Sequence, residues 1–234
     1  MAQRPGGEMS ARPLHFIWIA DCSGSMAGGK IGSLNFAIKE ALPEMQKVAD
    51  ENPNAQVFVR AIKFSDGAQW HVSQPTEVKD FKWVDLTADG GTDMGKAMEE
   101  VAKILKMPPM ETRALPPVLV LLSDGQPTDN FDGSLKTLMS EPWGQKAVRL
   151  AIAIGEDADH DCLQKFIGHS ERKPIQAHDA PTLVKLIKWA STAVLKAASS
   201  PASQPKGAAI ASGVPIPAPP PPSGGQGNAG GWVF

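Results

Sequence analysis

Two runs of five apolar residues constrain the fold of this chain more than any other feature. Phe16–Ala20 and Val118–Leu122 contain no polar residue, and each run stops abruptly at a polar loop. Strands that alternate apolar and polar residues bury one face, whereas continuously apolar strands are typical of burial on both faces. We therefore predict that both runs are central strands of a parallel sheet, and that the first covers residues 14–20.

Amphipathic segments alternate with these and further strand-like runs. The spacing of apolar side chains predicts helices over residues 31–50, with an irregularity at Pro43, and over 92–105, 160–168 and 181–198. Further strand-like runs are 56–64, 83–86, 147–154 and 175–177, and 68–72 is predicted to pair with 56–64 across an Asp-Gly turn. The alternation predicts an α/β fold: a doubly wound, mostly parallel sheet with helices on both faces and one antiparallel edge strand.

Candidate ligands follow three of the strand-like segments. Asp21, Ser23 and Ser25 are two residues apart, so in an extended chain their side chains point in the same direction. Thr92 follows a pair of glycines, and Asp124 follows the second apolar run. Because ligands bind at the carboxyl ends of the strands in open α/β sheets, we expect these five side chains to converge there. Carboxylate and hydroxyl oxygens suit Mg²⁺, Mn²⁺ or Ca²⁺ better than zinc or copper.

Composition narrows the classes of function. With 234 residues and 42% hydrophobic content, the chain is long enough for one domain with a full core. The net charge of −2 does not favour binding to nucleic acid or to an anionic membrane surface. Neither a signal peptide nor a run of about 20 apolar residues is present, so we expect a cytoplasmic protein. Cys22 and Cys162 are expected to be buried free thiols. No histidine lies near Cys22 in the sequence to act as a base, so Cys22 is not expected to be a nucleophile.

The motifs that carry these residues resemble those of a known family. In order and spacing, Asp21-x-Ser23-x-Ser25, Gly-Gly-Thr92-Asp and Leu-Ser-Asp124-Gly-x-Pro-Thr-Asp are similar to a von Willebrand factor A domain with a complete metal-ion-dependent adhesion site, over residues 12–198. The resemblance implies that Ser23, Ser25 and Thr92 approach a magnesium ion through their hydroxyls. It also implies that Asp21 and Asp124 act largely through water or hydrogen bonds.

Within that family, the lead-in Arg12-Pro13-Leu14 and the Asp21–Met26 loop are most similar to bacterial cytoplasmic proteins of the tellurite-resistance (TerY-like) type. The resemblance implies a role in a stress-response or defence system. It also implies two partners there, a protein kinase and a PP2C-type phosphatase.

The expected function is non-enzymatic: a Mg²⁺-dependent adaptor in which an Asp or Glu of a protein partner displaces a water from the metal. The alternative is a metal-dependent hydrolase or phosphatase. A haloacid-dehalogenase phosphatase needs a second acid where this chain has Ser23, and a Gly-x-Ser-x-Gly elbow is excluded by Asp21. No phosphate-binding Gly-x-x-x-x-Gly-Lys-Ser/Thr loop occurs. Asp93 and Asp129, next to motif positions, are interpreted as cap or turn residues.

Changes of composition predict the domain boundaries. We expect a flexible leader over residues 1–12, one domain over 13–198, and a disordered proline- and glycine-rich tail over 199–234. The chain then closes on Trp232, Val233 and Phe234, aromatic and apolar side chains that are unexpected in a solvated tail. They suggest a partner-binding hook, and incidental aromatic residues are the alternative.

Overall fold

The computed structural model describes residues 11–200 and 214–221. Within these residues six strands form one sheet in the order β3-β2-β1-β4-β5-β6, and every neighbouring pair is parallel except β2 and β3. The strands are β1 (Arg12–Asp21), β2 (Ala55–Ser65), β3 (Gly67–Glu77), β4 (Val118–Ser123), β5 (Val148–Ile154) and β6 (Ile175–Ala177). The predicted fold class is therefore confirmed, including its antiparallel edge strand.

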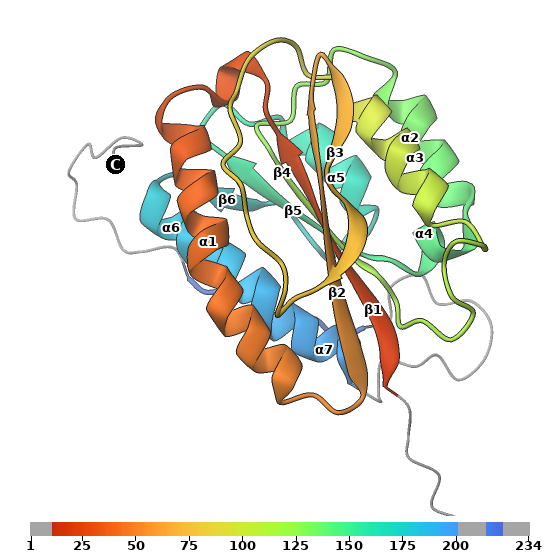
Figure 1. Ribbon diagram of the computed structural model, residues 1–234. Coiled ribbons are helices and arrows are strands. Elements are labelled where there is room, and N and C mark those ends of the chain that lie inside the picture. The colour runs from red at the N-terminus through yellow and green to blue at the C-terminus, as the bar shows by residue number, and fades with distance from the viewer. Residues whose placement is uncertain (1–10, 201–213, 222–234) are drawn as a thin grey trace, which may run out of the picture.

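Helices cover both faces of the sheet (Figure 1). One layer consists of α1 (Gly29–Asp50), α6 (Ala180–Trp189) and α7 (Leu195–Ser199), the last two joined by a π-helical turn, η2 (Ala190–Val194). The other layer consists of α2 (Met94–Ile104), α3 (Phe131–Ser140), α4 (Pro142–Lys146) and α5 (His160–Ile167). A 3-10 turn, η1 (Gly24–Met26), lies between β1 and α1, at the upper end of β1 in Figure 1.

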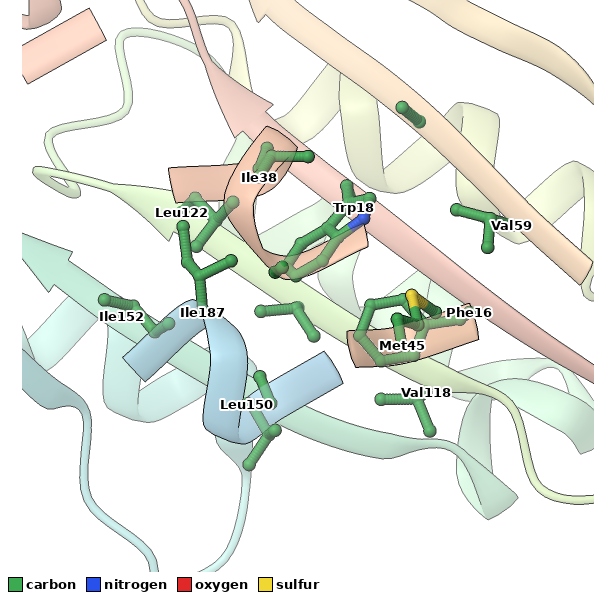
Figure 2. Close-up of a cluster of buried hydrophobic side chains, with 14 of the residues drawn as sticks. Phe16, Trp18, Ile38, Met45, Val59, Val118, Leu122, Leu150, Ile152 and Ile187 are labelled. Atoms are coloured by element: carbon green, nitrogen blue, oxygen red, sulfur yellow. The ribbon is translucent and has the colours of Figure 1, made fainter. Parts of the chain in front are cut away.

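The central strands divide their side chains between two cores. Phe16 and Trp18 of β1 pack with α1 and α6, as Figure 2 shows, whereas Ile17 and Ile19 pack with α2, α3 and α5. All six residues of β4 and all seven of β5 are buried. Burial on both faces explains why the apolar runs lack polar alternation. The parallel register of β1 and β4 brings their ends to one edge of the sheet.

Two parts of the fold differ from the sequence prediction. Residues 83–86 do not form a strand; the side chain of Asn35 on α1 instead accepts hydrogen bonds from Leu86 N (2.8 Å) and Trp83 Nε1 (3.0 Å). The buried side chains in this loop produced the apolar pattern of a strand. The helices α3 and α4 were not predicted, although Phe131, Leu135 and Leu138 have helical spacing.

The described part of the proline-rich segment contacts the domain. Val214 is buried in the core beside α6 and α7, and its carbonyl accepts a hydrogen bond from Arg172 (2.8 Å). Ile216 packs against the same core. The predicted leader, apart from its last two residues, and the hook at 232–234 lie outside the described residues.

Across residues 11–200 and 214–221, none of the helices has the length and apolar character needed to cross a membrane.

Candidate metal centre

The ends of two adjacent strands form the floor of the candidate site. Asp21 is the last residue of β1, and β1 pairs with β4 in a register that sets Ala20 opposite Leu122. Ser123 closes β4, and Asp124 follows it. Polar residues that are far apart in sequence therefore meet at one edge, because the two strands are parallel and end at the same level.

Asp21 is completely buried and held from two sides. Its Oδ1 accepts a hydrogen bond from Ser23 N (2.8 Å), and its Oδ2 accepts one from the Ser123 hydroxyl (2.5 Å). Burial raises the pKa of Asp21 to about 6, although the hydrogen bonds from Ser123 and Ser23 oppose that shift. At neutral pH the carboxylate is thus ionised in a setting that favours a nearby cation.

The two serines of the first loop lie together. The hydroxyls of Ser23 and Ser25 are 3.0 Å apart, with Ser23 buried and Ser25 exposed at the rim. Backbone hydrogen bonds join this loop to the next one: Gly24 N donates to Gly90 O (2.9 Å), and Asp89 N donates to Cys22 O (2.8 Å). The loop that precedes α2 is therefore fixed against the loop that follows β1.

Thr92 is buried and linked to the third loop. Thr128 N donates to Thr92 O (2.9 Å), and Thr92 N donates to the Thr128 hydroxyl (3.1 Å). With the Ser123–Asp21 hydrogen bond, these contacts connect all three loops. The structure thus brings the predicted ligands to the same edge of the sheet on a network of hydrogen-bonded loops.

Asp124 shows the clearest need for a cation. The residue is 3% exposed, and neither carboxylate oxygen has a hydrogen-bond partner in the described part of the chain. Lys30 Nζ lies 3.5 Å from Oδ2, within ion-pair range but longer than the roughly 2.7–2.9 Å of a charge-assisted hydrogen bond. Because a buried carboxylate without donors is costly, this site fits a bound metal ion.

The acids next to the motif residues stabilise local backbone, Asp129 as a helix cap and Asp93 at a turn, as predicted. Asp129 accepts hydrogen bonds from Gly95 N and Lys96 N (both 2.8 Å) at the start of α2. Asp93 accepts one from Gly67 N (2.8 Å) and pairs with Lys96. These carboxylates support the loops.

The surroundings of both cysteines disfavour the thiolate form. Cys22 and Cys162 are buried free thiols, as predicted, and burial raises the pKa of each to about 12. No group of three or more His, Cys, Asp or Glu side chains able to hold a metal ion occurs among the described residues. The candidate centre is instead a mixed set of hydroxyls and carboxylates.

Three supporting residues were missed in the sequence. Ser123 and Thr128 stand inside the third motif, but only the structure shows them as partners of Asp21 and Thr92. Lys30 gave no sequence signal, because a single lysine at the start of a helix is ordinary.

The sequence and the fold both match those of a known domain family. The profile of the von Willebrand factor type A domain matches residues 17–189, whereas no curated protein sequence matched. Solved structures that share the fold include the following three. A von Willebrand factor type A protein from Catenulispora acidiphila has 19% identity and a TM-score of 0.59, over 78% of this chain and 42% of that one. The pilus adhesin SpaC from Lactobacillus rhamnosus GG, in an open conformation, has 15% identity and a TM-score of 0.61, over 79% and 30%.

The third is proximal thread matrix protein 1 from the mussel byssus, solved with zinc in its metal-ion-dependent adhesion site (MIDAS) motif. It has 19% identity and a TM-score of 0.57, over 79% of this chain and 46% of that one. This chain therefore spans less than half the length of each of the three structures. At such identities the likeness shows the fold alone.

Proposed function

The chain belongs to the von Willebrand factor type A domain family, and from this premise we propose that it is a non-enzymatic module that binds a protein partner through a divalent metal ion. The observation that carries the proposal is the buried Asp124 carboxylate, without hydrogen-bond donors among the described residues and beside hydroxyl-bearing loops. The three motifs together constitute, in this proposal, a complete metal-ion-dependent adhesion site.

Each residue has a distinct part in this proposal. Ser23, Ser25 and Thr92 would hold Mg²⁺ through their hydroxyls, and Asp21 and Asp124 would supply the negative charge around it. Ser123 and Ser23 N keep the Asp21 carboxylate oriented toward the first loop. The bound ion supplies a Lewis-acidic centre with an exchangeable position, which suits a partner's Asp or Glu.

Magnesium is the proposed ion because hydroxyl-rich sites with few direct carboxylates suit a hard cation that keeps several waters. The zinc in the mussel protein is a reason to test other ions. Isothermal titration with Mg²⁺, Mn²⁺, Ca²⁺ and Zn²⁺ gives the order of affinity. Tightest binding of Zn²⁺, with no measurable Mg²⁺ binding at millimolar concentration, would contradict the choice of magnesium.

The environment of Asp21 and Cys22 favours binding over catalysis. Asp21 is enclosed by hydrogen bonds, and the Cys22 thiol stays protonated at neutral pH. Phosphatase and ATPase assays on purified protein test the alternative of a metal-dependent hydrolase. Turnover that is lost in Asp21→Ala would establish that alternative.

We also propose a protein kinase and a PP2C-type phosphatase as partners, in a bacterial stress response of the TerY-like type. The lead-in supports this only weakly, because Arg12 has a structural role: its guanidinium donates to Arg113 O (2.7 Å) and Ala114 O (2.8 Å). Leu14 is likewise a core residue. Co-purification with each candidate enzyme tests the partner proposal separately from metal-dependent binding.

A pull-down from native lysate tests the function. Wild-type protein with Mg²⁺ is compared with wild-type protein in EDTA, with Asp21→Ala, and with a deletion of residues 232–234. Asp80→Ala, at an exposed acid outside the three motifs, is the matched control. We expect capture only with metal and an intact Asp21. Capture that survives both EDTA and Asp21→Ala would refute the proposal, and loss on deletion alone would assign binding to the C-terminal hook.

A further inference from the structure

Lys30 connects the candidate metal site to a fourth loop. It is the second residue of α1, and its Nζ lies between two carboxylates, 3.5 Å from Asp124 Oδ2 and 3.1 Å from Asp157 Oδ1. The Lys30 side chain is 14% exposed, whereas that of Asp157 is 68% exposed. One partner of the lysine is therefore inside the site and the other is in solvent.

The loop after β5 packs closely against the end of the Lys30 side chain. Gly155, after β5, has φ = +91°, and a Cβ atom there would lie 2.8 Å from Lys30 Cε and 2.9 Å from Nζ. Gly155 N donates to Ala177 O (3.0 Å), which fixes the loop against β6. The same Cβ would lie 2.7 Å from Asp157 Oδ1, so glycine at position 155 leaves room for the ion pair between Lys30 and Asp157.

We propose that Lys30 is an internal counter-ion that competes with the divalent metal for Asp124. In the metal-free protein its ammonium balances the buried Asp124 carboxylate. When the metal binds, Lys30 gives up Asp124 and keeps Asp157 as its partner. This inference rests on the proposed metal-binding function and adds a residue that sets its affinity.

The chemistry of lysine suits this role. Its ammonium is a compact charge on a flexible stem, so it can move between two carboxylates at little cost. A divalent ion and an ammonium repel each other at short range, and both are attracted to the same buried oxygens. Metal affinity then depends on the difference between the two pairings of Lys30, which is a coupling between the lysine position and the metal.

Calorimetric titration with Mg²⁺ tests the competition. We expect Lys30→Met to bind Mg²⁺ roughly 5-fold or more tightly than wild type, in the range typical of coupled sites. Lys30→Gln is the second variant, in case Met disturbs the loop. Lys39→Met is the matched control, because Lys39 lies on the same helix and pairs with Asp85 (2.6 Å) outside the three motifs. Its affinity should equal that of wild type.

A double-mutant cycle identifies Lys30 as the mediator. Asp157→Asn removes the outer partner, so Lys30 stays with Asp124 and Mg²⁺ binding weakens. In the Lys30→Met background the same substitution should have little effect. Equal weakening in both backgrounds would mean that Asp157 acts directly on the ion, and it would overturn the proposed exchange of partners.

Thermal melting gives a readout that does not depend on a partner. In EDTA, Lys30→Met should melt below wild type because Asp124 loses its counter-ion, and Mg²⁺ should raise its Tm by more than it raises that of wild type. If wild-type protein binds Mg²⁺ and both Lys30 variants bind it equally or more weakly, the Lys30 proposal alone is overturned. If wild type and every variant bind no divalent ion, the proposed function itself fails.

Discussion

Ser123 shows how one hydroxyl connects two strands and a loop. Its Oγ donates to Asp21 Oδ2 (2.5 Å) and accepts from Gly125 N (2.7 Å). Ser123→Ala leaves a buried carboxylate short of a donor, so we expect it to lower the free energy of unfolding by about 1–3 kcal/mol and to weaken metal binding. Urea denaturation and Mg²⁺ titration measure the two effects.

The control for Ser123 is Ser33→Ala. Ser33 is equally buried, but its hydroxyl donates to Gly29 O one helical turn earlier on α1. We expect a smaller stability change there and an unchanged metal affinity. If the two variants lose metal affinity equally, Ser123 has no special role in orienting Asp21.

His15 should make stability depend on pH. Burial lowers its pKa below the usual 6.5, with Glu111 opposing the shift through a hydrogen bond (3.0 Å). The unfolded chain therefore takes up a proton at a higher pH than the native protein, and stability falls as pH drops below about 6.5. We expect His15→Asn to lose less unfolding free energy than wild type between pH 7 and pH 5.5.

Paired urea titrations at the two pH values measure this difference. Asp21 changes stability in the opposite direction, because its pKa is raised, but it does so in both proteins and cancels in the comparison. An identical pH dependence in wild type and His15→Asn would show that His15 does not titrate in this range.

The conformation of the loop before α2 depends on glycine at position 90. Gly90 has φ = +79°, and a Cβ there would lie 2.6 Å from Asp66 Oδ2. We expect Gly90→Ala to cost about 1–3 kcal/mol of stability and to weaken metal binding, since this loop carries Thr92. Gly32→Ala on α1 is the matched control, where a Cβ meets nothing within 4 Å. There we expect a gain of about 0.5–1 kcal/mol. Chemical denaturation of both variants checks the contrast.

Comparing the caps of α2 and α3 distinguishes an effect on stability from an effect on the geometry of the metal site. Asp129 caps α2 and Asn130 caps α3, where its side chain accepts from Gly133 N (3.2 Å). Substituting either by Ala should cost about 0.5–2 kcal/mol. We expect only Asp129→Ala to weaken Mg²⁺ binding, because its neighbour Thr128 holds Thr92. Equal losses of affinity would show that the effect is general destabilisation.

At the scale of the whole molecule, the proline-rich segment contributes to stability. Val214 is 3% exposed and packs in the core beside α6. We expect Val214→Ala to lower the free energy of unfolding by about 1–2 kcal/mol through the lost transfer energy and the cavity. Pro219→Ala, at an exposed position of the same segment, should change it little. Equal values for the two variants would show that the segment is not held on the domain in solution.

Much of the sheet could be predicted, because its strands carry their burial in their sequence. The runs at 16–20 and 118–122 were correctly predicted as strands. Residues 83–86 have the apolar pattern of a strand, but they form a loop in the structure. Asp21, Ser23, Ser25 and Asp124 could be placed at one edge by the rule for parallel strands. Thr92 follows residues 83–86, which are not a strand, and its contacts with Thr128 place it there instead. Metal occupancy stays a prediction.

Other features were out of reach because they depend on contacts between distant segments. The approach of Lys30 to Asp124 needs the loop after β5, and no pattern along α1 encodes it. The burial of Val214 likewise depends on contacts with α6 and Arg172, which lie far from it in the sequence.

The edge strand β3 has a consequence for colloidal behaviour. Among the described strands it pairs with β2 alone, it carries Pro75, and its register against β2 is interrupted by bulge-like shifts. A proline has no amide hydrogen to donate, and irregular register twists an edge away from a flat template. We therefore expect edge-to-edge pairing of two copies along β3 to be disfavoured.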